Sequence, residues 1–275
     1  MRPSAFGVAL WASACVALSF LLLPIVAIFS ELTLGELRAG LTSEVARDAL
    51  RVTLETNLVA MALIVLFGTP TAYLLASREF RGRTLLVTLV ELPLVLPPAV
   101  AGIGLLAAFG RLGLLGGTME SLGLDIAFTK TAVVLAVTFV ASPFYVRTAI
   151  AAFEGVDRDL VAASRTLGAG PARTFFRVAL PLAGGGLGAG AALAFARGLG
   201  EFGATIMFAG SLQGVTQTLS LAIYQEFDVD FDTALAIGAL LVVGSALVLL
   251  AAKVIPAWRR STSTSTTLFA PSASR

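Results

Sequence analysis

The chain has 275 residues, of which 57% are hydrophobic and 13% charged, and its formal net charge is +2. A soluble domain carries about 25% charged residues, so the composition excludes an ordinary soluble fold and predicts an all-α integral membrane protein in the lipid bilayer. The small net charge gives no field that would attract nucleic acid. The absence of histidine and the single cysteine, Cys15, exclude His-based catalytic triads, an internal disulfide and most metal sites.

A helix crosses the hydrocarbon core with about 20 apolar residues. Six stretches reach that length, at about 6–29, 56–76, 84–109, 131–153, from about 180, and 234–255. The first could instead be a signal peptide, because Arg2 precedes it, but Pro24 and Ser30 make a poor cleavage site, which favours a retained helix. In the third stretch, Pro93, Pro97 and Pro98 are expected to bend the helix.

These stretches divide the chain into three regions. Residues 1–55 are predicted to form the first transmembrane helix and an external loop, and residues 56–256 a core with five transmembrane helices and a prominent loop at 154–181. The Ser/Thr-rich segment 257–275 is predicted to be a disordered cytoplasmic tail.

Arginine placement predicts the orientation through the positive-inside rule. Arginines concentrate in the link 77–83, in the loop after the fourth span and near 259–260, whereas segment 225–232 carries four acidic residues and no basic one. Six crossings place the basic segments together on one side, so both termini of this multi-pass chain are predicted to be cytoplasmic. The loop 31–55 contains Arg38, Arg47 and Arg51 and is nevertheless expected to be external.

The loop 154–181 contains signals for a helix, a sharp corner and a second helix. Asp157 is a good N-cap, and Gly168 fits the left-handed position that ends a helix. Pro171 is well placed to open the next helix. The spacing predicts one apolar face, formed by Val156, Leu160, Ala163, Ser164 and Leu167. On physical grounds alone, such a helix could also lie on lipid headgroups.

The spacing of Ala162, Ala163 and Gly168, followed by Val178, Leu180 and Pro181, resembles the cytoplasmic loop of ABC importer permeases. This sequence has Ala162 where that family usually has Glu, and Ser164 where it usually has Ala. The resemblance implies a type I ABC importer permease fold with a coupling helix that docks in a groove of a separate ATPase. The implied coupling residues are Asp157, Leu160, Ala162, Ala163, Arg165, Leu167 and Gly168.

Longer stretches resemble molybdate permeases above all, with sulfate permeases next. They are Leu92–Pro98 (LPLVLPP), Phe109–Gly116, Leu193–Gly210 and Thr218–Tyr224. The resemblance implies import of molybdate or tungstate by alternating access, with sulfate or thiosulfate as the alternative. It also implies a homodimer, two ATPase subunits that bind ATP-Mg, and an external oxyanion-binding protein in the cell membrane.

Charged residues inside the spans mark candidate functional positions. Arg197 and Glu201 are four residues apart and can pair on one helix face. Glu201 is therefore either part of an external gate or one half of a structural ion pair, and Pro97 and Pro98 are expected to shape the same pathway. Glu91 lies in the third span. It either faces the dimer interior or lies shallow enough in the membrane to reach water.

The chain lacks a phosphate-binding loop for ATP, since its two lysines, Lys130 and Lys253, follow Thr and Ala. It is predicted to be no enzyme and to bind no cofactor itself. A secondary transporter is a rival interpretation, but the two halves show no repeat. An integral membrane enzyme would need a nucleophile or metal constellation, and the sequence offers none.

Overall fold

The computed structural model describes residues 5–263, and all regular structure in this range is helical. The all-α prediction is confirmed. The long helices are α1 (Ala5–Ser30), α3 (Glu44–Ser77), α4 (Arg83–Val95), α5 (Pro98–Phe109), α7 (Lys130–Glu154), α10 (Leu180–Leu199) and α13 (Phe231–Ser263). The short ones are α2 (Leu34–Thr42), α6 (Gly116–Ser121), α8 (Arg158–Thr166), α9 (Pro171–Thr174), α11 (Gly203–Ala209) and α12 (Leu219–Glu226), and a π-helical turn, Phe175–Ala179, joins α9 to α10.

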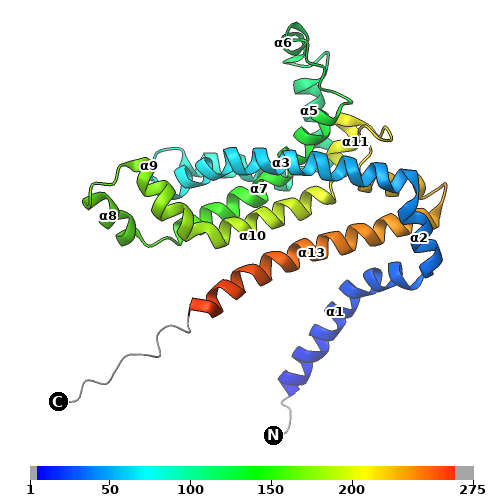
Figure 1. Ribbon diagram of the computed structural model, residues 1–275, viewed down its shortest axis with the longest axis horizontal. Coiled ribbons are helices and arrows are strands. Elements are labelled where there is room, and N and C mark those ends of the chain that lie inside the picture. The colour runs from blue at the N-terminus through cyan, green and yellow to red at the C-terminus, as the bar shows by residue number, and fades with distance from the viewer. Residues whose placement is uncertain (1–4, 264–275) are drawn as a thin grey trace.

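Helices α3, α7 and α10 lie side by side and form the core of an elongated bundle, with α13 along it (Figure 1). Small residues, among them Ala72, Ala141 and Ala194, are fully buried between these helices. In the same core the Tyr145 hydroxyl lies 2.6 Å from Thr69 Oγ1, which satisfies both polar groups. We call the two ends of the bundle the α8 end and the α2 end after the short helices that lie there.

Five helices in the described part of the chain are long and apolar enough to cross a membrane, and a bent pair makes a sixth candidate. The bent pair is α4 and α5, whose axes differ by 113°. The expected third span at 84–109 is therefore a broken helix rather than one rod. Pro97 and Pro98 have no N–H to continue the helical ladder, and Leu96 before them is extended, with φ −66° and ψ 132°. The predicted bend is confirmed.

The expected external loop at 31–55 is wrong as a loop, because most of it is helical. Thr33 starts α2 with a capping box in which Glu36 accepts hydrogen bonds from the Thr33 backbone and hydroxyl. These bonds hold the pKa of the Glu36 carboxyl below its ordinary value. Ser43 caps α3, which begins twelve residues before the predicted span. Local capping explains the difference, since charged residues extend a helix as readily as apolar ones.

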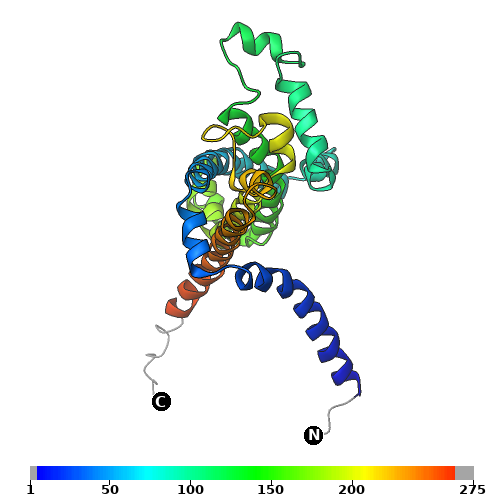
Figure 2. The same cartoon turned by 90° about the vertical axis from the view of Figure 1, so that its right-hand side faces the viewer.

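Helices α1 and α13 show how the chain leaves the bundle. Helix α1 diverges from the other helices in both views (Figures 1 and 2), and its large apolar side chains, such as Trp11 and Phe20, are 75% exposed. Helix α13 continues to Ser263, so the first part of the tail expected to be disordered is helical. Residues 264–275 of that predicted tail lie outside the described range.

Candidate functional site

The α8 corner forms as the sequence predicts. The Asp157 carboxylate accepts a hydrogen bond from the Asp159 N–H at 2.9 Å, which caps α8. Gly168 ends the helix with φ +81°, and the Ala169 N–H donates to the Ser164 carbonyl at 3.0 Å, closing a Schellman-type turn. Pro171 then occupies the first turn of α9. The backbone therefore reverses sharply at one end of the bundle.

Helix α8 has two different faces, and the single predicted apolar face is divided between them. Ser164 turns inward, where its hydroxyl lies 3.0 Å from Thr174 Oγ1, and Val156 is partly buried against the bundle core. Leu160 and Leu167, by contrast, are 49% and 88% exposed, and Ala163 lies between them at the surface. A small apolar strip at 160, 163 and 167 thus faces away from the chain. Ala162 is also exposed.

A pocket of about 690 Å³ separates α8 from the ends of α3 and α7, and Ala162 and Arg165 line it. Its basic side chains are Arg78, Arg83, Arg158 and Arg165. Arg83 is fixed, because it contacts Glu154 Oε1 at 2.6 Å and donates to the Leu75 carbonyl at 2.6 Å. The base of the pocket is aromatic, since Tyr73 packs edge-on against Phe153 at 5.2 Å. Helix α8 packs on α9 and on the π-helical turn, and this pocket lies between it and the ends of α3 and α7.

At the α2 end, Glu201 is almost completely buried, with one carboxylate oxygen hydrogen-bonded and the other within ion-pair distance of an arginine. Oε1 accepts the Ala204 N–H at 2.8 Å, and Oε2 lies 2.7 Å from the Arg197 guanidinium. The Arg197 side chain remains 27% exposed, against 1% for Glu201. The predicted pairing is present, and the carboxylate also supports the start of α11.

Arg197 meets the helix break between α4 and α5. A small cavity of about 100 Å³ is lined by Arg197, by Pro98 and by α4 and α7 side chains that include Phe144. Pro97 and Pro98 are both exposed in the chain. Helix α11 packs closely on α5 beyond the break, because a Cβ on Gly102 would lie 2.6 Å from the Ala204 carbonyl oxygen. Of the predicted pathway residues, Arg197 and Pro98 line one cavity, Glu201 pairs with Arg197, and Pro97 directly precedes Pro98.

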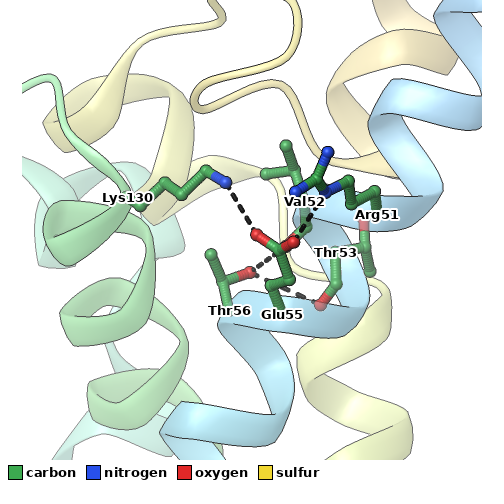
Figure 3. Close-up of polar contacts among 6 residues, drawn as sticks. All are labelled: Arg51, Val52, Thr53, Glu55, Thr56 and Lys130. Carbon is green, nitrogen blue, oxygen red and sulfur yellow. Dashed lines mark hydrogen bonds and ion pairs between the residues drawn. The ribbon is translucent and has the colours of Figure 1, made fainter.

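Three polar side chains of α3 tie the α2 end together, and the sequence analysis did not single them out. Glu55 lies between Arg51 and Lys130, at 2.7 Å from each (Figure 3), and so connects α3 to α7. Thr53 Oγ1 accepts the Leu219 N–H at 2.8 Å, and Asn57 donates to the Phe195 carbonyl at 3.1 Å. Apart from the Arg51–Glu55 pair within α3, these bonds join α3 to segments more than seventy residues away, so no local pattern could reveal them.

Glu91 has a partner, Arg147, that the sequence analysis missed. Glu91 Oε1 lies 3.5 Å from Arg147 Nε, between α4 and α7. The sequence does contain a signal for Arg147, because it is a lone arginine inside the apolar run of α7. A charge at membrane depth is costly and usually has a partner or a function. Among the described residues, no group of His, Cys, Asp and Glu is placed to hold a metal ion.

Comparisons with known proteins agree with this architecture. The family model described as "Binding-protein-dependent transport system inner membrane component" matches residues 64–260. The molybdenum transport system permease protein ModB of Mycobacterium tuberculosis is 47% identical over 86% of this chain and 90% of its own length. A probable sulfate transport system permease protein of the alga Nephroselmis olivacea is 36% identical over 87% and 86%.

A solved bacterial alginate ABC transporter shares the fold. It matches 91% of this chain and 93% of its own with a TM-score of 0.68 at 17% identity. The family model covers more than half of the chain, including the bent α4–α5 pair, the α8 corner and the Arg197–Glu201 pair. The chain therefore belongs to the family of binding-protein-dependent transport system inner membrane components.

Proposed function

We propose that this chain is the membrane pathway for molybdate or tungstate in an importer built on two copies of it. The observation that carries the proposal is the 47% identity, over 86% of the chain, to a molybdenum transport permease. The stretch Leu193–Gly210, one of those that resemble molybdate permeases, contains the Arg197–Glu201 pair beside the helix break.

Family membership sets the general role. The chain is the multi-pass inner-membrane permease subunit of an ABC importer and works with an ATPase and a binding protein. It is not itself catalytic, carries no cofactor, and leaves ATP binding to the ATPase. The secondary-transporter and membrane-enzyme interpretations therefore no longer apply.

The exposed strip on α8 supports a docking role for the predicted coupling residues. Leu160, Ala163 and Leu167 present apolar area to a partner, while Asp157 and Gly168 fix the ends of the helix. Helix α8 follows α7 after a short link, and Ser164 contacts Thr174 of α9, which leads through the π-helical turn into α10. Movement imposed on α8 would therefore pass to α7 and α10 as a rigid displacement. This role places the α8 end in the cytoplasm and the α2 end outside.

The oxyanion itself is tested by reconstituting the permease with its ATPase and binding protein in liposomes. We expect molybdate and tungstate to stimulate ATP hydrolysis and sulfate to do so weakly, since a binding protein selects the ion and the pathway binds it only loosely. Stimulation by sulfate but not by molybdate or tungstate would support the sulfate alternative, which the 36% identical relative favours. A Leu167→Asp variant should lose the stimulation. Leu112→Asp, at a similarly exposed apolar position on the α5–α6 segment, is the control and should keep it.

A further inference from the structure

Arg147 occupies an unusual position for an arginine. It lies seventeen residues into α7 and seven before the helix ends at Glu154, which is about 10 Å from the α8 end at 1.5 Å per residue. At this depth its side chain is 69% exposed in the single chain. Arginines within spans usually face a protein interior or a water-filled path, because lipid exposure of the charge is costly. Residue Arg147 therefore needs a polar environment outside its own bundle.

The ion pair with Glu91 does not meet that need fully. Its two atoms are 3.5 Å apart, whereas Arg83–Glu154 and Arg197–Glu201 are separated by 2.6 and 2.7 Å. Both members are more than a third exposed, and within residues 5–263 the Arg147 side chain makes no other ion pair or hydrogen bond. A guanidinium has five N–H donors in a planar fork, so most of them remain available to an anion.

Arg147 also lies on the same face of the bundle as Arg197. The cavity at the helix break is lined by Val140 and Phe144 of α7, by Leu94 of α4 and by Arg197. Arg147 follows Phe144 by three residues, and Glu91 precedes Leu94 by three, so the pair continues this face by one helical turn. Arg147 thus lies on the side of α7 that faces the cavity of Arg197, about 5–10 Å nearer the α8 end than the α7 residues that line this cavity.

We propose that Arg147 is an anion-binding station in the inner half of the pathway, which takes a tetrahedral oxyanion dianion after it passes Arg197. Glu91 holds the guanidinium in place between transport events and competes with the cargo. A dianion attracts the guanidinium more strongly than a monovalent carboxylate does at equal distance. The same carboxylate keeps the station weak, which allows release. This inference rests on the proposed transport of an oxyanion.

The test uses the opposite charges of the pair. In proteoliposomes that hold the full transporter, Arg147→Gln should lower molybdate uptake at subsaturating ion by about tenfold, the loss of one charge-assisted anion contact. Glu91→Gln should instead raise uptake at subsaturating ion, because it frees Arg147 to bind the ion more tightly, and lower the maximal rate at saturating ion, because release is then slower. The double variant should behave like Arg147→Gln. Arg111→Gln is the matched control, since Arg111 faces Glu120 at the same 3.5 Å with 74% exposure, and it should leave uptake unchanged.

Two results would contradict anion binding by Arg147. One is uptake by Arg147→Gln at the unsubstituted level, and the other is an equal loss in Arg147→Gln and Glu91→Gln, which would show a structural ion pair. If Arg147→Gln fails to assemble, Arg147→Lys, which keeps the charge, must still transport better than Arg147→Met, which keeps the length without it. Failure of the proposed function is distinct, because the unsubstituted transporter would then show no molybdate uptake at all.

Discussion

Glu201 and Arg197 are only four residues apart, yet they experience different surroundings. The carboxylate is buried and binds two partners, whereas the guanidinium is 27% exposed at the edge of a cavity. Of the two hypotheses for Glu201, this geometry favours the structural one, because a carboxylate that caps α11 cannot move without uncapping it. Arg197 is the member of the pair that can reach a passing ion.

Replacing Glu201 by alanine should therefore destabilise the protein more than replacing Arg197 does. Glu201→Ala removes both the partner of Arg197 and the acceptor of the Ala204 N–H, and breaking a buried pair alone costs about 3–5 kcal/mol. Thermal unfolding of the purified permease measures this difference, and Glu201→Gln should lie between, because it keeps an oxygen for the Ala204 N–H. A stable, fully assembled Glu201→Ala protein that has lost uptake would instead assign Glu201 to the gate.

At the level of elements, the α8 corner was predictable and the length of α3 was not. Asp157, Gly168 and Pro171 each act on their own backbone within a few residues, so their positions alone specify the start and the end of α8. The bend after Leu96 was predictable for the same reason. Helix α3 starts at a local cap, Ser43, which a search for apolar spans passes over. Its contacts Asn57–Phe195 and Glu55–Lys130 become visible only when distant segments meet.

The left-handed corner gives a direct prediction for coupling. Gly168→Ala should cost about 1–2 kcal/mol locally, because an L-residue is strained at positive φ, although no atom lies within 4 Å of an added Cβ. The strained corner should weaken ATPase binding and ion-stimulated hydrolysis. Gly170→Ala is the control, since Gly170 is equally open but has φ −66°. Equal effects of both substitutions would contradict the argument from backbone strain.

The contact between α5 and α11 gives a prediction for the helix break. Gly102→Ala should destabilise the protein by about 1–3 kcal/mol, because the new methyl group would lie 2.6 Å from the Ala204 carbonyl and 2.7 Å from Met207 Cβ. Gly104→Ala on the same helix meets nothing within 4 Å and should be neutral or stabilising by up to about 1 kcal/mol. Thermal unfolding of the two variants side by side checks the packing, and a stable Gly102→Ala protein would show that α11 can move away from α5.

At the scale of the whole molecule, the orientation of the bundle can be measured directly. In a Cys15→Ser background, an Asp228→Cys variant at the α2 end should react with a membrane-impermeant maleimide added to intact cells. Arg81→Cys at the α8 end should react only after the membrane is opened. Both positions are exposed, so a difference reflects sidedness. Labelling of Arg81→Cys from outside would reverse the orientation and remove the coupling role from α8.

The two ends of the bundle also differ in how they are fastened. Near the start of α3, the side chains of Thr53, Glu55 and Asn57 each bond to a different distant segment through short directional bonds. Near its other end, Tyr73, Phe153 and Phe175 touch ring against ring. Hydrogen bonds lose strength steeply when their angle changes, whereas ring faces can slide while staying in contact. The α2 end, held by these directional bonds, would therefore stay fixed when the α8 end is displaced, and the chain would tilt about it.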